Sequence, residues 1–312
     1  MIKEKGNGYF YVLNYPEYEE ELCKLEMRRL FKVNIENKYL VSKVKINPTR
    51  SPFIKECIEI MYDTESLEKL ISCIKNDLTE FDSFKVNFIR LKKNEATYSE
   101  RLSAMKEIGV AIKGTVNIHN ANTILGVIKI EGRWIFGIYK KNDCKWHEHD
   151  NKPFSYSNAL SVRVARALIN IAVGDNLNKR VLDPCCGVGT VVIEGLSMGI
   201  DIVGYEINPQ IACNGKGNLK AFGYESGIIK GDMREIKDKY DACIVDLPYG
   251  LFTKTTREEQ IGIIKASRTI AKEVIIISSE DMDDFIVNEG FNIIDRGYVT
   301  KNNFKRFISV CK

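Results

Sequence analysis

The 312-residue sequence lacks the features of a membrane or secreted protein. No stretch approaches the roughly 18 consecutive apolar residues of a membrane-spanning helix, and the first five residues lack the apolar region of a secretory signal. The nine cysteines are scattered and form no Cys-x-x-Cys pair, which is typical of reduced thiols in a reducing compartment. We therefore expect a cytoplasmic protein that has no membrane partner.

The sequence also lacks an excess of either charge. Its 46 basic and 42 acidic residues give a net charge of +4, so bulk charge predicts no particular partner. Only three histidines are present, and two of them, His147 and His149, lie near Cys144. Because no second cluster completes a tetrahedral site, we expect no bound metal there and interpret the segment as a polar interdomain linker.

Two different patterns divide the chain. The first half alternates strand-like and helix-like segments in the manner of small α+β modules, whereas from Phe154 onward apolar strands alternate strictly with helices. The second pattern predicts a parallel sheet covered on both faces. The stretch 140–153 is polar and unpatterned, so we expect an N-terminal domain over residues 1–145 and a second domain over 146–312.

The expected elements follow from apolar periodicity and from turn and capping residues. In the first half we expect strands at 9–13, 39–44, 84–90, 115–118, 126–130 and 134–139, and helices at 22–31 and 66–78. In the second half we expect strands at 180–183, 201–206, 228–230, 242–246 and 274–278, helices at 158–173, 189–198 and 257–271, another helix opening at Asn208-Pro209, and a terminal hairpin of 291–298 with 304–310.

Three strand ends in the second half carry residues suited to a nucleotide-like cofactor. The first strand ends at Asp183 and leads through Gly187 and Gly189, which let the backbone turn sharply and approach a ligand. The next strand ends at Glu206, about 20 residues on, where doubly wound folds place an acid that accepts ribose hydroxyls. The third ends before Asp232-Met233, which predicts a carboxylate for an adenine amino group and an apolar side chain against the ring.

The same region excludes two common nucleotide sites. Val192 stands where the third glycine of a dinucleotide fingerprint belongs, and no Gly-Lys-Ser/Thr of a phosphate-binding loop is present. An adenosine-containing cofactor without a bound pyrophosphate fits better, and S-adenosylmethionine meets that description.

The fourth strand ends in Val-Asp-Leu-Pro-Tyr-Gly, residues 245–250. Methyl transfer to an aromatic amino group needs two acceptors for its N–H hydrogens and a ring on which the base stacks. Asp246 offers a carboxylate, Leu247 a backbone carbonyl and Tyr249 an aromatic face, while Pro248 sets the turn. These four are the predicted catalytic residues, and positioning supplies the catalysis because the methyl donor is already activated.

From residue 152 to the C-terminus the chain resembles amino-directed methyltransferases that carry an (Asp/Asn)-Pro-Pro-Tyr motif. More narrowly, the THUMP-containing tRNA guanine N2-methyltransferase family is similar in three segments, namely 183–190 with Glu194, 206–208 and 246–250. The N-terminal half is similar only in outline, near Val116 to Ile118 and on to Trp134. The resemblance implies a ferredoxin-like and THUMP-like domain that grips tRNA, followed by a Rossmann-like doubly wound methyltransferase domain with a C-terminal antiparallel hairpin.

The resemblance also implies roles for individual positions. The glycine loop and Thr190 would hold the methionine part of the cofactor. Residues 246–249 would receive the target base, a guanine at position 6 or 10 of tRNA. The cofactor-binding set predicted in full is Ser157, Asp183, Cys185, Gly187, Gly189, Thr190, Glu206, Ile207, Asp232, Met233 and Asp246.

Two departures from the family pattern stand out. Leu247 replaces the first proline of the motif, which removes a fixed φ but keeps the carbonyl, so we expect activity with a less rigid loop. Residues 154–157 replace a His-Pro that relatives often carry before the helix. Both changes bear on how the target and the cofactor are positioned.

Other functions stay open at this point. The same motif serves enzymes that methylate ribosomal RNA, DNA bases or a protein glutamine, and an RNA-binding relative that has lost catalysis would share the fold. Nothing in the sequence indicates an obligatory protein partner. Basic residues that would contact RNA phosphates, or merely solvate the surface, are Lys301, Lys305 and Arg306 on the terminal hairpin, and Arg90, Lys92 and Lys93.

Overall fold

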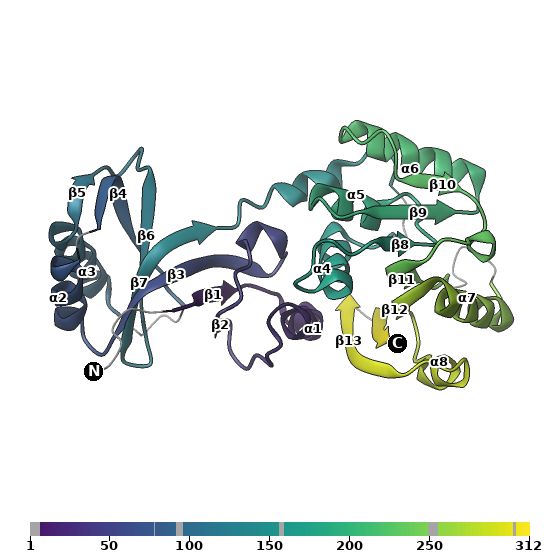
Figure 1. Ribbon diagram of the computed structural model, residues 1–312, viewed down its shortest axis with the longest axis horizontal. Helices are drawn as coiled ribbons and strands as arrows, with labels where there is room; N and C mark the ends of the chain where they lie inside the picture. The colour runs from purple at the N-terminus through teal and green to yellow at the C-terminus, as the bar shows by residue number, and fades with distance from the viewer. Residues whose placement is uncertain (1–6, 78, 92–95, 156–158, 249–254, 302–303) are drawn as a thin grey trace. The chain divides into compact units, whose positions relative to one another are not determined.

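The computed structural model describes the chain except for residues 1–6, 78, 92–95, 156–158, 249–254 and 302–303 (Figure 1). The chain forms two compact units. The first unit contains Met1–Asn14 and Ile35–Asp143, and the second contains Tyr15–Asn34 and Cys144–Lys312. No described helix is long and apolar enough to cross a membrane.

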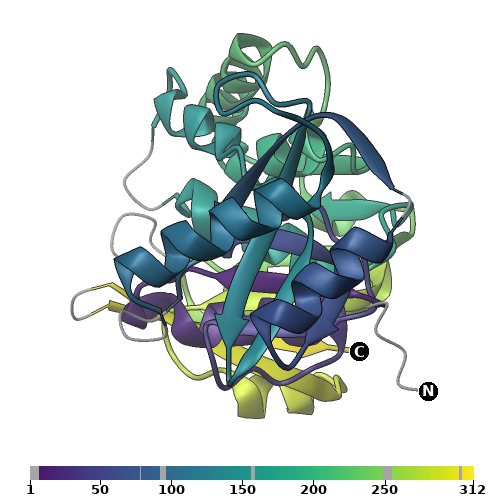
Figure 2. The same ribbon diagram turned by 90° about the vertical axis from the view of Figure 1, so that its left-hand side faces the viewer.

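The first unit is built on one seven-stranded sheet with the strand order β2-β1-β3-β7-β6-β4-β5. Helices α2 and α3 lie side by side on one face of this sheet (Figure 2) and bury Leu70 and Ile108 against Phe84 and Phe136. Thr97 and Glu100 form a capping box that fixes the start of α3. The elements are β1 (Tyr9–Leu13), β2 (Tyr39–Ser42), β3 (Ile54–Thr64), α2 (Leu67–Asn76), β4 (Glu80–Phe88), α3 (Tyr98–Ala111), β5 (Lys113–Val116), β6 (Thr123–Ile130), β7 (Arg133–Lys141) and a 3-10 turn at Pro48–Arg50.

The second unit is a doubly wound α/β fold, as the sequence predicts. Its sheet has the order β10-β9-β8-β11-β12-β14-β13, and β14 runs antiparallel to both neighbours. The strand order reverses between β8 and β11, which is the point where such sheets bind ligands. The strands are β8 (Val181–Asp183), β9 (Ile202–Glu206), β10 (Ile228–Lys230), β11 (Tyr240–Asp246), β12 (Ala271–Ser278), β13 (Ile293–Lys301) and β14 (Phe304–Cys311).

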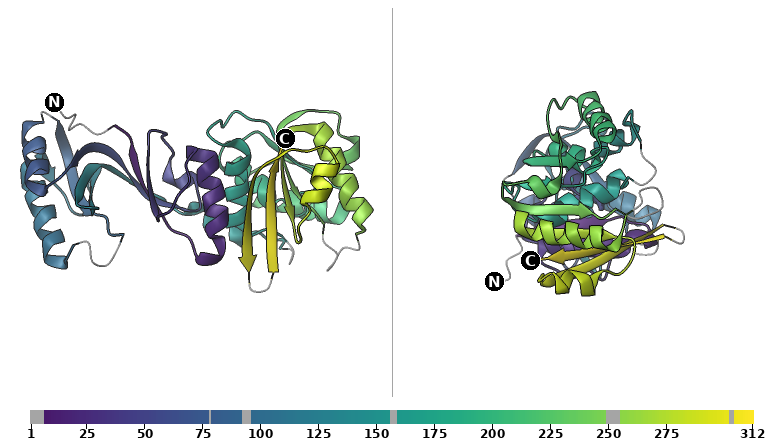
Figure 3. Two further views of the ribbon diagram at one scale, coloured as in Figure 1. Left: turned by 90° about the horizontal axis from the view of Figure 1, so that it is seen from below. Right: turned by 90° about the vertical axis from the view of Figure 1, so that its right-hand side faces the viewer.

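Helices cover both faces of this second sheet (Figure 3). On one face, α7 and α8 pack against apolar side chains such as Cys243, Val245 and Ile276. On the other face lie α1 and α4, and α5 and α6 pack against β9 and β10. The helices are α1 (Glu20–Phe31), α4 (Val162–Val173), α5 (Thr190–Ser197), α6 (Pro209–Ala221), α7 (Arg257–Ile270) and α8 (Asp283–Asn288), with 3-10 turns at Glu17–Glu19, Lys145–Asn151 and Met233–Glu235.

Helix α1 belongs to the second unit although it lies near the N-terminus. It packs against α4 and β13, and a Cβ on Gly297 of β13 would lie 2.9 Å from the Cδ2 atom of Leu25. The sequence-based division into 1–145 and 146–312 places residues 15–34 in the first domain. The difference arises because the apolar stripe of α1 predicts that the helix is buried but does not identify its partner.

Other elements also differ from the sequence prediction. Helix α4 begins at Val162, capped by Ser161, and not at residue 158. Strand β3 and helices α3 and α8 were not predicted. The segment expected to be a polar linker forms the 3-10 turn at Lys145–Asn151, in which Trp146 is buried.

Candidate functional site

A pocket of about 850 Å³ lies at the carboxyl ends of the parallel strands of the second unit. The loops after β8, β9, β10 and β11 and the first turns of α7 form its walls. It therefore sits at the switch point that the topology predicts. Among the residues predicted from sequence, the pocket is lined by Asp183, Cys185, Gly187, Thr190, Glu206, Ile207, Asp232, Met233, Asp246, Leu247 and Pro248.

Of the predicted residues that the structure describes, Gly189 does not line this pocket. Gly189 lies behind the pocket wall, where it is the N-cap of α5 with φ 81°. A Cβ on Gly189 would lie 2.6 Å from the Cδ1 atom of Ile228, so the position requires glycine for packing. Ser157 and Tyr249 lie outside the described residues.

The loop after β8 leaves backbone open to a ligand. Gly187 has φ 53°, in the left-handed region that favours glycine, and a Cβ placed on it would meet nothing within 4 Å. The Oγ1 atom of Thr190 is buried and has no hydrogen-bond partner among the residues that the structure describes. Such an atom is poised to bond a group that enters the pocket.

Glu206 ties the first two loops together. Its carboxylate accepts hydrogen bonds from the backbone N–H of Gly187, at 3.0 Å, and of Asn208, at 2.7 Å. A carboxylate has about four acceptor positions, so acceptor capacity remains for hydroxyl groups of a ligand. The acid at the end of β9 thus holds the glycine loop and faces the pocket at the same time.

Asp232 caps the short turn Met233–Glu235 by accepting from the backbone N–H of Arg234 at 2.9 Å. The Arg234 guanidinium also pairs with both carboxylate oxygens, with Nε at 2.9 Å from Oδ1 and 3.0 Å from Oδ2. This hydrogen bonding lowers the pKa of Asp232. Asp232 is therefore ionised and already paired, while the buried Met233 supplies an apolar wall.

Asp246 at the end of β11 has a strongly raised pKa. Burial raises its pKa to about 7, and the positive charge of Arg306 on β14 acts in the opposite direction. Its Oδ1 atom is buried without a hydrogen-bond partner among the described residues. Burial also raises the pKa of Asp183 well above its usual value, with the nearby charges of Asp246 and Glu206 adding to the effect.

Leu247 and Pro248, which follow Asp246, are held by contacts that the sequence did not reveal. The Leu247 side chain is buried, and its backbone N–H donates to the Ile277 carbonyl at 2.9 Å. The Pro248 carbonyl accepts from Gln260 Nε2 of α7 at 2.8 Å. The helix over 257–271 was predicted but its contribution to the pocket wall was not, and Thr256 and Glu259 form a capping box at its start. The residues of this wall that line the pocket are Thr255, Glu258, Glu259, Gly262 and Ile263.

A buried ion network lies behind the pocket. Glu194 of α5 is fully buried and pairs with Arg166 of α4, whose Nη1 lies 2.7 Å from Oε2, and with the Nδ1 of His149. The interpretation of residues 140–153 as a polar linker is therefore wrong for this part, because His149 and Trp146 pack into the second unit. No metal-binding group of His, Cys, Asp and Glu occurs among the described residues.

These residues fit an adenosine-containing cofactor. The glycine loop offers open backbone, Glu206 offers acceptors at the end of β9, and Met233 and Ile207 offer apolar surface in the same pocket. A carboxylate oxygen of Asp246, buried and without a hydrogen-bond partner in the described part of the chain, lies at the end of β11. The pocket can therefore bring a nucleoside-like ligand next to a hydrogen-bond acceptor for an amine.

Residues 149–276 match the UPF0020 family, described as an RMKL-like methyltransferase domain. The matched segment lies within the second unit. The pocket residues from Asp183 to Pro248 all fall within this segment. The match does not extend to the first unit.

Similar proteins include several archaeal enzymes. A tRNA (guanine(10)-N2)-dimethyltransferase of Methanothermobacter thermautotrophicus is 28% identical over 165 residues, covering 49% of each chain. One from Pyrococcus abyssi is 29% identical over 203 residues, covering 59% of each chain. A tRNA (guanine(6)-N2)-methyltransferase of Methanocaldococcus jannaschii is 23% identical over 248 residues, covering 61% of this chain and 65% of that protein.

The chain spans about half the length of the first two of these relatives. Among solved structures, the Thermus thermophilus protein TrmN aligns over 98% of this chain and 99% of its own, with 14% identity and a TM-score of 0.48.

Proposed function

We propose that the methyltransferase domain transfers a methyl group from S-adenosylmethionine to the exocyclic N2 amine of a guanine in tRNA. The names of the similar archaeal proteins support guanine in tRNA, at position 6 or 10, as the target. The observation that carries the proposal is the buried Oδ1 of Asp246, which lacks a partner among the described residues and lies in the same pocket as Glu206 and Asp232.

The reaction requires the guanine amine to be drawn out of conjugation with its ring. Asp246 and the Leu247 carbonyl accept its two N–H hydrogens, and this leaves the nitrogen lone pair directed at the methyl donor. S-adenosylmethionine would supply an activated methyl group, so the protein needs no nucleophile of its own. The methyl–sulfur bond breaks as the nitrogen–carbon bond forms, the neutral thioether leaves, and the amine gives up one N–H proton to the Asp246 carboxylate. A base within a tRNA helix must be flipped into such a pocket. Stacking on Tyr249 stays a prediction from the motif.

The cofactor roles follow from the three other strand ends. Glu206 accepts from the ribose hydroxyls, and the loop from Gly187 to Thr190 holds the methionine part. Asp232 accepts from the adenine amino group, with Met233 against the ring. Asp183 and Cys185 complete the floor of the pocket, and a contact from Ser157 stays a prediction.

The first unit is the RNA-gripping module in this proposal. Its α+β fold, which has one continuous sheet, is compatible with the ferredoxin-like and THUMP-like arrangement that the sequence suggests. Because tRNA is the substrate, we also propose that the protein works in the cytoplasm.

Competition between acceptors tests the substrate class. Purified protein and labelled methyl donor are incubated in four separate reactions. Their acceptors are unmodified tRNA, ribosomal RNA, DNA and a protein mixture. We expect label in tRNA, and its loss in Asp246→Ala, which still binds the donor in calorimetry because Asp246 faces the base. Label in ribosomal RNA, DNA or protein alone would replace tRNA as the substrate. No donor binding at millimolar concentration would instead favour an RNA-binding relative without catalysis.

A further inference from the structure

We propose that Gln260 of α7 is a positioning residue for methyl transfer. Together with the backbone N–H of Leu247, it holds Leu247 and Pro248, the two residues that follow β11, so that Asp246 and the Leu247 carbonyl converge on the target amine. The proposal rests on the proposed function for its kinetic consequences, but the hydrogen bonds that carry it are independent of any substrate.

The orientation of the Gln260 amide is determined by its two partners. Nε2 donates to the Pro248 carbonyl at 2.8 Å, and Oε1 accepts from Arg257 Nη1 at 2.9 Å. A guanidinium can only donate and a carbonyl can only accept, so the reverse orientation of the amide would lose both bonds. Gln260 is 8% exposed, and the loss of either bond would leave a polar group poorly solvated.

Arg257 is itself anchored, so the contact to the loop starts from a fixed point. Its Nη2 lies 2.8 Å from Glu280 Oε1, and its guanidinium lies 5.0 Å from the centre of the Phe285 ring. It also contacts the sulfur of Met282. A chain of polar contacts therefore runs from the segment after β12 through Arg257 and Gln260 to Pro248.

Leu247 fixes the other side of the loop. Its N–H donates to the Ile277 carbonyl at 2.9 Å, which extends the β11–β12 pairing one residue beyond Asp246. Its side chain is 1% exposed and packs in a core with Ile264 and Ile286. A proline at this position has no N–H and could not make the first contact. The sequence alone predicts a less rigid loop at Leu247, because it does not reveal these two contacts.

The kinetic test is Gln260→Ala. Removal of the Nε2 donor leaves the Pro248 carbonyl without this hydrogen bond, so the adjacent Asp246 and Leu247 can shift. Small displacements of such reacting groups lower the rate of the chemical step. We expect kcat to fall on the order of 10-fold or more, while the dissociation constant of S-adenosylmethionine stays within about two-fold, since Gln260 is not a pocket-lining residue. The matched control is Ser267→Ala on the same helix, a buried side chain that donates to the Ile264 carbonyl within that helix. Its kcat should remain at the wild-type value.

Gln260→Glu separates positioning from packing. An ionised carboxylate of nearly the same size cannot donate to the Pro248 carbonyl, whereas a protonated one can. The Arg257 guanidinium beside this position keeps the carboxylate ionised, so kcat should fall at least as far as in Gln260→Ala. A kcat near the wild-type value would contradict the role of the donated hydrogen bond.

A substrate-independent measurement is amide hydrogen exchange at Leu247. Gln260→Ala should accelerate this exchange, and Ser267→Ala should leave it unchanged. If wild type methylates no RNA, the proposed function fails while this measurement still tests the loop. Unchanged exchange together with unchanged kcat in Gln260→Ala would overturn the proposal. Leu247→Pro should lower kcat, and equal or higher activity in that variant would overturn the role of the Leu247 N–H.

Discussion

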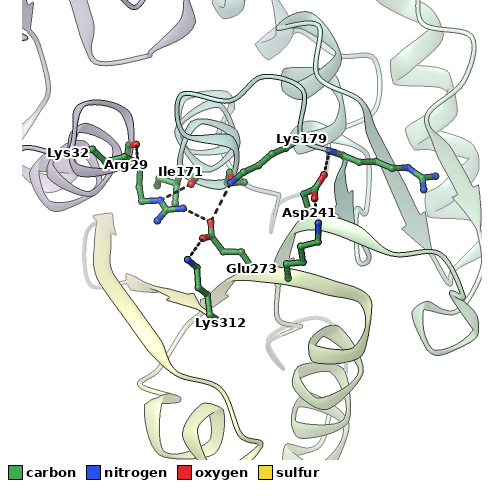
Figure 4. A network of polar contacts seen from close by, with 10 residues as sticks. Arg29, Lys32, Ile171, Lys179, Asp241, Glu273 and Lys312 are labelled. Atoms are coloured by element: carbon green, nitrogen blue, oxygen red, sulfur yellow. Dashed lines mark hydrogen bonds and ion pairs between the residues drawn. The ribbon is translucent and has the colours of Figure 1, made fainter. Parts of the chain in front are cut away.

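Arg29 of α1 and Glu273 of β12 form an ion pair although 244 residues separate them (Figure 4). The Arg29 Nε also donates to the Ile171 carbonyl at the end of α4, at 3.0 Å. Glu273 is 6% exposed, and Lys179 and Lys312 lie 4.0 and 3.9 Å from its carboxylate. A segment from the N-terminal part of the chain is thus joined to the rest of the second unit at a nearly buried acid.

We expect Arg29→Ala to destabilise the second unit by about 2 kcal/mol. Breaking a buried pair typically costs ~3–5 kcal/mol, and the two lysines near Glu273 offset part of this. Urea unfolding followed by Trp146 fluorescence in a Trp134→Phe background reports this unit. The control is Lys24→Ala, whose pairs with Glu20 and Glu21 on the same helix are partly exposed, with an expected change within about 0.5 kcal/mol. Equal effects of the two variants would contradict the placement of α1.

The raised pKa of Asp246 predicts a pH-dependent gain in stability for Asp246→Asn. A carboxyl whose pKa is higher in the folded state stabilises the fold at low pH, and this contribution is lost as the pH rises from about 4 through about 7. Between pH 5 and pH 8 the variant should gain on the order of 2 kcal/mol relative to wild type. In the control variant Asp241→Asn the pH dependence should have the opposite sign, because hydrogen bonding to Lys272 lowers the pKa of Asp241. Parallel stability curves for Asp246→Asn and wild type would refute the perturbation.

Arg306 should shift the pH below which activity falls. Asp246 must be ionised to accept the amine hydrogens, so kcat/KM should rise with pH and level off above about 7. The Arg306 charge lowers the pKa of Asp246, and Arg306→Gln should therefore move this limb to higher pH while activity at pH 9 changes less. Arg296→Gln, which removes a cation paired with Asp283, serves as control. An unmoved limb in Arg306→Gln would show that another group controls it.

The pairing of Asp232 with Arg234 predicts competition with the cofactor. If Asp232 binds the adenine amino group, the donor must displace hydrogen bonds from the exposed Arg234 side chain. Arg234→Ala should then lower the dissociation constant of S-adenosylmethionine about two- to five-fold, as measured by calorimetry. Weaker binding in this variant would mean that Arg234 itself contacts the cofactor, and Asp232→Ala would then be expected to have little effect.

The parallel strands and the cofactor loops were predictable because their signals are local. Apolar runs that end in Asp183, Glu206 and Asp246 place three acids at one edge of any parallel sheet, and the pocket brings them together. Glycines at 187 and 189 signal a turn wherever they occur after such a strand. Local pattern and chain direction were therefore sufficient for most of the pocket.

The remainder depends on contacts between distant residues. The segment with Trp146 and His149 is polar in sequence, and only its contact with Glu194, 45 residues later, gives it a structural role. The exposed surface of α3 includes Tyr98, Leu102 and Val110, which obscures the apolar stripe that would have predicted the helix. Gln260 carries no local signal, because its partner Pro248 belongs to another element.

The most direct test of the account is the identity of the methylated nucleoside. Wild-type protein is incubated with unmodified tRNA and labelled S-adenosylmethionine, and the tRNA is digested to nucleosides and separated. We expect label in N2-methylguanosine or N2,N2-dimethylguanosine, and none with Asp246→Ala. Label in N6-methyladenosine, or in protein alone, would contradict it.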